Sequence, residues 1–144
     1  MNGLIFQSDR TRERIELVSR TDFKQPLSND QRRLLQILDK HFGEKRSITI
    51  REITSRTTFN ARAVKQLAQE LRHSPFFIPI CSSRSADGGL FLAETDQERR
   101  HFAKIMSSQS LSMMRCACNF LEPHEITAEM EPFLALVQEG GVRG

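Results

Sequence analysis

The sequence predicts a mainly helical fold with one small β-hairpin, an α+β arrangement. Two observations predict it: repeated capping signals that begin helices, and a single pair of short apolar runs separated by a polar loop that contains glycine. The chain has 144 residues, enough for one domain of ordinary size or a small domain with added segments. A chain of this length can bury a core without help from a metal or disulfides.

Three helices are predicted to begin with a capping box. The first side chain of this motif accepts a hydrogen bond from a free backbone amide, and the fourth side chain reaches back to the backbone of the first residue. The matching segments are residues 28–31 (SNDQ), 49–52 (TIRE) and 95–98 (TDQE).

The first two of the central helices differ in length. One is predicted over 29–42, where Gly43 ends a stripe formed by Leu34, Leu35, Leu38 and Phe42. A strand-like stretch, 47–49, leads into the second helix at 50–56.

The third helix is predicted over 61–73, after a short connection and with Asn60 as its cap. Its apolar face consists of Val64, Leu67, Ala68 and Leu71, and its polar face carries Arg62, Lys65, Gln66, Gln69 and His73. Pro75 closes the segment, because a proline disfavours the helical conformation of the residue before it.

A β-hairpin is predicted next, with strands at 77–81 and 90–93 and a polar loop at 82–89. Pro79 has to lie at an edge or an end, since it cannot donate a ladder hydrogen bond. The order of helix, strand, short helix, turn, helix and hairpin is the layout of a winged helix-turn-helix. We therefore expect a winged helix-turn-helix domain over residues 28–93.

A long helix is predicted over 96–121, within a segment 94–121 that follows the hairpin. At about 1.5 Å per residue it would span nearly 40 Å, more than a small three-helix core can cover. We expect its apolar stripe to cap the core or to form a dimer or partner interface through Phe102, Ile105, Met106, Met113 and Phe120.

The sequence predicts the structure of the two ends of the chain less definitely. Residues 1–27 form an amino-terminal extension that we expect to pack on the core, as a helix or a strand. Residues 122–144 form an acidic, apolar tail, in which Pro132 is compatible only with a helix start or a kink. A helix that completes the core, a segment that binds a partner or mimics DNA, and disorder all remain open for this tail.

Charge is polarised along the sequence. The net charge is +3, and residues 28–73 carry ten basic and five acidic side chains, whereas residues 94–144 carry five basic and eight acidic ones. A basic centre favours a polyanionic partner, which the acidic end would repel. A solvated surface with a chance gradient would give the same counts.

Specific residues resemble a known family. The resemblance is carried by Arg51-Glu52-Ile53, Arg62-Ala63-Val64-Lys65, Leu71-Arg72, Pro79-Ile80-Cys81-Ser82-Ser83 and Gly88-Gly89-Leu90-Phe91-Leu92-Ala93. At these positions the chain is similar to winged helix-turn-helix proteins encoded by phages and prophages of Gram-positive bacteria. The resemblance extends over about 28–121. The sequence departs from the pattern at Leu90, where such proteins commonly have an aromatic residue.

A winged helix of this kind is expected to bind double-stranded DNA, as a transcriptional regulator or a replication accessory. The second helix of the motif enters the major groove, where arginine can pair with guanine and asparagine or glutamine with adenine. Threonine and arginine side chains nearby can contact phosphates. The residues expected to bind DNA are Arg51, Arg56, Thr57, Thr58, Asn60, Arg62, Lys65, Gln66, Gln69 and Arg84.

The alternative is a protein-interaction module. In this interpretation, the winged helix binds and inhibits a host protein of transcription, replication or defence, such as a defence nuclease targeted by an anti-CRISPR. Two features favour this interpretation: the acidic, apolar tail, and a wing loop whose single basic residue is accompanied by Asp87.

Signatures of other classes of protein do not occur. The sequence contains no phosphate-binding glycine loop, no His-Glu-x-x-His motif and no nucleophile elbow, so we expect neither an enzyme nor a cofactor. Cys116 and Cys118 would point about 200° apart on a helix, which makes them poor joint metal ligands, and Cys81 is expected in the core. With no apolar run that could span a membrane, a cytoplasmic protein is expected.

Overall fold

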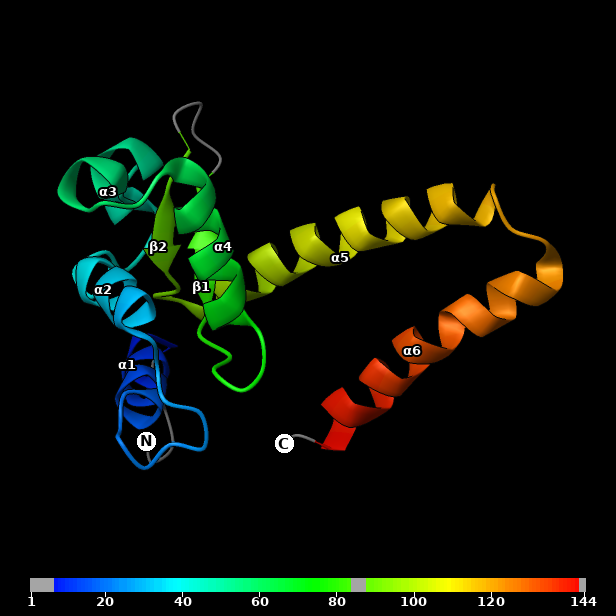
Figure 1. The fold of residues 1–144 in the computed structure, drawn as a ribbon, viewed down its shortest axis with the longest axis horizontal. Coiled ribbons are helices and arrows are strands. Elements are labelled where there is room, and N and C mark those ends of the chain that lie inside the picture. The colour runs from blue at the N-terminus through cyan, green and yellow to red at the C-terminus, as the bar shows by residue number, and fades with distance from the viewer. Residues whose placement is uncertain (1–6, 84–87, 143–144) are drawn as a thin grey trace. The chain divides into compact units, whose positions relative to one another are not determined.

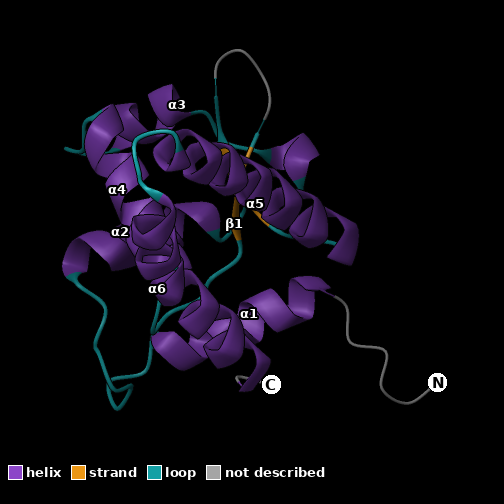
Figure 2. Ribbon diagram, turned by 90° about the vertical axis from the view of Figure 1, so that its right-hand side faces the viewer, coloured by secondary structure: helices purple, strands orange, loops and turns teal. Residues whose placement is uncertain are grey.

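The structure is a computed structural model that describes residues 7–83 and 88–142. Its described part is mainly helical and contains one two-stranded antiparallel sheet, which confirms the α+β class (Figures 1 and 2). The chain divides into two compact units, residues 1–103 and residues 104–144.

Most of the secondary structure belongs to the first unit. Its elements are α1 (Gln7–Val18), α2 (Asn29–Leu38), the short 3-10 helix η1 (Glu44–Arg46), α3 (Ile50–Arg56), α4 (Ala61–Arg72), β1 (Ile80–Ser82), β2 (Leu90–Leu92) and the beginning of α5 (Asp96–Cys118).

The expected helix caps are present. Ser28 Oγ accepts from the Gln31 amide at 3.1 Å, and Gln31 Oε1 accepts from the Ser28 amide at 2.9 Å, so the capping box of α2 is complete. Thr49 Oγ1 accepts from the Glu52 amide at 3.1 Å and begins α3, but the Glu52 carboxylate lies near Arg56, so only half of the predicted capping box is present. These caps satisfy amides that the first turn of a helix leaves without a partner.

The helix predicted over 29–42 is shorter than expected. α2 ends at Leu38, and Phe42 forms a parallel bridge to Leu92 in β2 instead of extending the helix. The Leu92 amide donates to the His41 carbonyl at 2.8 Å, and the Gly43 amide donates to the Leu92 carbonyl at 2.9 Å. The apolar stripe misled the prediction because Phe42 is buried at a backbone bridge to β2 and not on the face of α2.

The hairpin also begins later than predicted. Phe77 has a φ of 51°, which breaks the strand expected from residue 77, and the Ile78 amide donates to the Leu71 carbonyl at 2.9 Å. In the paired part, Ile80 lies opposite Leu92 and Ser82 lies opposite Leu90. Ile48 bridges Leu90 on the other edge of β2, so the strand-like stretch at 47–49 is one isolated bridge.

The core of the first unit is formed where α2, α3 and α4 pack together and against the sheet. α4 contacts both α2 and α3, and it also contacts β1. The side chains with 2% exposure or less include Leu34, Leu38, Ile48, Ile53, Val64, Leu71, Phe76, Ile78, Ile80 and Leu92.

Helix α1 packs on this core, and its sequence left helix and strand open. Val18 is fully buried in the main apolar cluster. Thr11 Oγ1 lies 3.2 Å from the Ala93 carbonyl oxygen. Arg14 donates from Nε to the Phe76 carbonyl at 2.6 Å and from Nη2 to the Pro75 carbonyl at 2.7 Å.

The second unit contains the rest of α5 and α6 (Pro123–Val142). α5 ends at Cys118, three residues before the predicted end. Pro132 lies inside α6 and not at its start, so of the two expected positions the helix start is wrong. Helical spacing of Ile126, Met130 and Phe133 spans the proline, and the proline removes one backbone hydrogen bond.

Within residues 7–83 and 88–142, none of the helices combines the length and the apolar character needed to cross a membrane.

Replacing Arg14 tests how α1 is held. Arg14→Met should lower the free energy of unfolding by about 1–3 kcal/mol, because two carbonyl oxygens lose a charged donor. Arg10→Met, at an exposed position one turn earlier in the same helix, is the matched control and should change the free energy of unfolding by less than about 0.5 kcal/mol. Urea denaturation of both variants measures this, and equal effects would contradict the docking role of Arg14.

Candidate nucleic-acid interface

The outward face of α4 carries a continuous polar stripe. Val64, Leu67, Ala68 and Leu71 are buried on the inner face of this helix. The opposite side chains are exposed; these are Arg62, Lys65, Gln66 and Gln69. In the described part of the chain, the side chains of Arg62, Lys65 and Gln69 make no hydrogen bond or ion pair, while Gln66 Nε2 donates to Glu70 at 3.4 Å. Two cations and two amides are thus presented to solvent on one helix.

The connection between α3 and α4 is only residues 57–60. Thr57 is half-buried, and its hydroxyl donates to the Ile53 carbonyl at 2.8 Å and accepts from the Phe59 amide at 3.2 Å. Asn60 Oδ1 accepts from the Ala63 amide at 2.8 Å, which caps α4. Thr57 and Asn60, both expected to contact DNA, therefore use their side-chain oxygens within the turn, and both Thr58 and Asn60 are exposed.

Both arginines of α3 are exposed. Arg51 lies in its first turn, and Arg56 Nη2 lies 3.8 Å from Glu52 Oε2 at its end. Both side chains of this pair are more than half exposed, so the pair contributes at most about 1 kcal/mol. Such a weak pair leaves the Arg56 guanidinium available to a phosphate.

Arg33 is a cation that the sequence analysis missed. It belongs to α2, and its Nη2 donates to the Arg56 carbonyl at 3.4 Å. The fold therefore adds an exposed positive charge at the carboxyl end of α3. Because the two residues are 23 positions apart in sequence, helical periodicity gives no signal for this pairing.

The loop between β1 and β2 is only partly described. Arg84, the expected contact at its tip, and Asp87 lie outside the described residues. At its base, the Ser83 amide donates to the Gly89 carbonyl at 2.8 Å. A Cβ at Gly89 would lie 3.1 Å from the Ile48 carbonyl oxygen, so the close approach of the two backbones favours glycine there.

Arg72, at the end of α4, has a structural role. Its Nε donates to the Ile80 carbonyl at 2.6 Å, its Nη2 donates to Ser82 Oγ at 3.1 Å, and the guanidinium lies 4.9 Å from the centre of the Phe102 ring. Burial lowers the pKa of this guanidinium. Arg72 thus joins α4 to β1 and to the first turns of α5 instead of facing outward.

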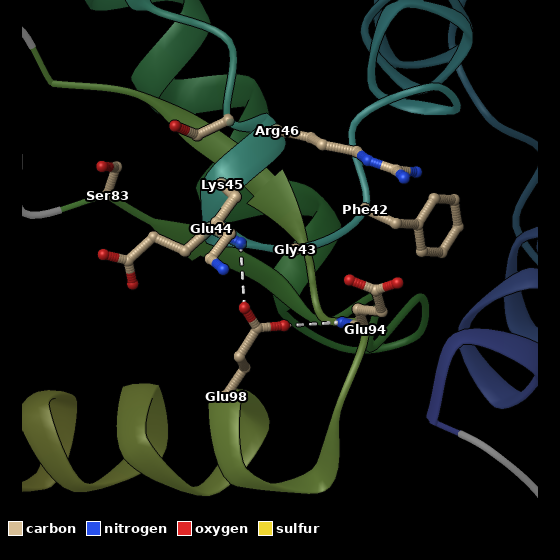
Figure 3. A pocket seen from close by; sticks show the side chains of 9 residues that line it. Phe42, Gly43, Glu44, Lys45, Arg46, Ser83, Glu94 and Glu98 are labelled. Atoms are coloured by element: carbon tan, nitrogen blue, oxygen red, sulfur yellow. Dashed lines mark hydrogen bonds between the residues drawn. The ribbon is translucent and has the colours of Figure 1, made fainter.

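A hollow of about 840 Å³ lies beside η1 and the start of α5 (Figure 3). Glu98 points into it, and its carboxylate accepts from the Glu44 amide at 2.8 Å and from the Glu94 amide at 2.9 Å. Gly43 has a φ of 89°, and a side chain there would clash with the Glu94 carboxylate. Glu98 therefore holds backbone turns together, which is a structural function.

No group of three or more His, Cys, Asp or Glu side chains that could hold a metal ion occurs among the described residues. Cys81 is buried, and burial raises the pKa of its thiol to about 12, with further contributions from nearby charges. Cys116 is exposed and Cys118 is half-buried.

The residues expected to form a dimer or partner interface fall into two groups. Phe102 and Ile105 are half-buried, and Phe102 packs against the cluster of Cys81, Phe91 and Ala93. The remaining three are exposed; these are Met106, Met113 and Phe120.

Comparison of the chain with protein-family models, with curated proteins and with solved structures finds no match.

Substitutions of Asn60 separate its capping role from any role in binding. Asn60→Ala should lower the free energy of unfolding by about 0.5–2 kcal/mol, because the Ala63 amide loses its acceptor. Asn60→Asp should leave it within about 0.5 kcal/mol of the parent, since aspartate caps equally well. Thermal or urea denaturation measures the stability of both variants. Equal losses of stability for the two would contradict the capping role of Asn60.

Thiol titration tests the burial of Cys81. At pH 8 a disulfide reagent should modify Cys116 and Cys118 in the native protein, and Cys81 only after denaturation, because only the thiolate reacts. Cys81→Ser should leave the native thiol count unchanged. Rapid modification of Cys81 in the native protein would contradict the burial of its thiol.

Proposed function

We propose that the first unit is a winged helix-turn-helix that binds double-stranded DNA, with α4 as the helix that enters the major groove. The observation that carries the proposal is the exposed stripe of Arg62, Lys65, Gln66 and Gln69 on a helix whose other face is buried. Arginine, lysine and glutamine are the side chains that read guanine and adenine edges in that groove.

The order and packing of the elements support the proposal. α3 packs against α4 and is joined to it by four residues, 57–60, as in helix-turn-helix motifs. The hairpin β1–β2 follows α4, which is the place of a wing. In such motifs the first helix crosses the backbone while the second contacts bases, so Arg51 and Arg56 would face phosphates.

The central part of the unit carries the excess of positive charge that binding to DNA requires. Arg33 and Arg56 add cations beside the α3–α4 turn, where the DNA backbone would pass. Residues 28–73 contain twice as many basic as acidic side chains, ten against five. A surface of this kind neutralises phosphates and gives salt-dependent affinity.

The resemblance to winged-helix proteins of phages and prophages favours a role in regulating transcription or in assisting replication. In either role, base contacts by α4 would select the site, and contacts by α3 and Arg33 would fix the protein on the duplex.

Charge reversal on α4 tests the proposal. The parent protein should bind a labelled duplex with an affinity that falls steeply as salt rises from about 50 to 300 mM. Lys65→Glu should weaken binding at least about tenfold and reduce the salt slope by about one, since one phosphate or base contact is lost. Fluorescence anisotropy measures both quantities.

Lys24→Glu is the matched control, because it makes the same change of charge at an exposed site in the loop between α1 and α2. This loop lies at the end of the first unit away from α3 (Figures 1 and 2). The control should bind nearly as well as the parent. Absence of binding at low salt, or equal losses for both variants, contradicts the proposal and favours the protein-interaction alternative.

A further inference from the structure

The second unit exposes an unusual number of apolar side chains. None of its described side chains is buried, in either the carboxyl-terminal part of α5 or α6. The large apolar side chains that face solvent are Met106, Leu111, Met113, Phe120, Phe133, Leu134 and Leu136. Folded units of roughly 40 residues usually need disulfides, a metal or association with another chain. Among its described residues the second unit thus has no buried core, which favours association with another surface.

Two of these residues lie on one face of α5, and a third continues the same interval beyond the helix. Met106, Met113 and Phe120 are seven residues apart, and Phe120 lies two residues after Cys118, where the helix ends. Met113 is 74% exposed and Phe120 is 83% exposed. Side chains at a seven-residue interval stay on one side of a helix, because seven residues make almost two full turns. We call this face the α5 seam.

The α5 seam suits an identical partner. Between residues 105 and 114 the helix has no charged side chain, so two copies of this face meet without repulsion. Gln109 lies on the same face, three residues after Met106 and four before Met113. Its amide both donates and accepts, so it can pair with its own copy across a two-fold axis.

Two other kinds of partner fit less well. Helix α6, which follows the seam, carries the exposed side chains of Glu125, Glu129 and Glu131. Their negative charge would repel DNA and anionic lipid. The α5 seam itself is uncharged between residues 105 and 114, so it carries no such repulsion toward a second copy.

We propose that two copies of the chain associate through the α5 seam, with Met106, Met113 and Phe120 at the interface and Gln109 facing its counterpart. A polar side chain at one seam position lowers stability but fixes the register of two helices. This inference is independent of DNA binding, because it concerns a different unit and a different face.

Sedimentation of the full chain between about 5 and 200 μM tests the proposal, since the dimer fraction should rise with concentration. Met113→Asp should weaken association at least about tenfold, because a charge would be buried without a partner. Leu111→Asp is the matched control: Leu111 is 50% exposed and lies about 200° around the helix from Met113. This variant should associate like the parent.

A cysteine at position 109 gives a second readout that does not depend on association strength. In a background with Cys116→Ser and Cys118→Ser, Gln109→Cys should form a covalent dimer under mild oxidation, and Leu111→Cys should not. Cys81 should stay unreacted, because it is buried. A monomer at all concentrations, a dimer unaffected by Met113→Asp, or equal cross-linking at 109 and 111 would overturn the proposal.

Discussion

Strand β2 is the element on which the first unit depends. Its three residues are paired on both edges, with β1 on one side and with the segments around Phe42 and Ile48 on the other. The backbone of Leu90 exchanges two hydrogen bonds of 2.9 Å with Ile48, and Leu92 bonds to His41 and Gly43. These pairs fasten the chain after α2 to the chain after α4. Leu92 is fully buried, so the same residue also joins the sheet to the apolar core.

The position of α4 follows from this constraint. β1 is held against β2, and Arg72 ties the end of α4 to β1 through the Ile80 carbonyl. The inner face of α4 is then covered by α2 and α3, and Asn60 fixes where the helix begins. The stripe of Arg62, Lys65, Gln66 and Gln69 is left on the outer face of these packed elements. A face held in this way can meet a groove without rearrangement, which is what the proposed recognition of DNA requires.

Local signals in the sequence predicted the central helices well. The caps at Ser28, Thr49 and Asn60 lie where expected, and α3 has the predicted bounds. Features that depend on distant segments were missed. Phe42 fits a helical stripe but pairs with Leu92, Phe77 takes a positive φ, and Arg33 meets the end of α3 only in the folded chain. For the candidate site, periodicity identified the exposed face of α4, but it could not show that the hydroxyl of Thr57 is engaged in the turn.

The measurement that tests the central proposal most directly is a titration of isotope-labelled protein with a short duplex, followed by amide chemical shifts. DNA recognition through α4 predicts that shifts concentrate at residues 61–69 and at Arg33, Arg51 and Arg56, with the loop at residues 19–28 unaffected. The shifts should fade as salt is raised, because phosphate contacts are screened. An unchanged spectrum at low salt, or shifts confined to residues 104–142, would contradict the assignment of α4 as the DNA-binding helix.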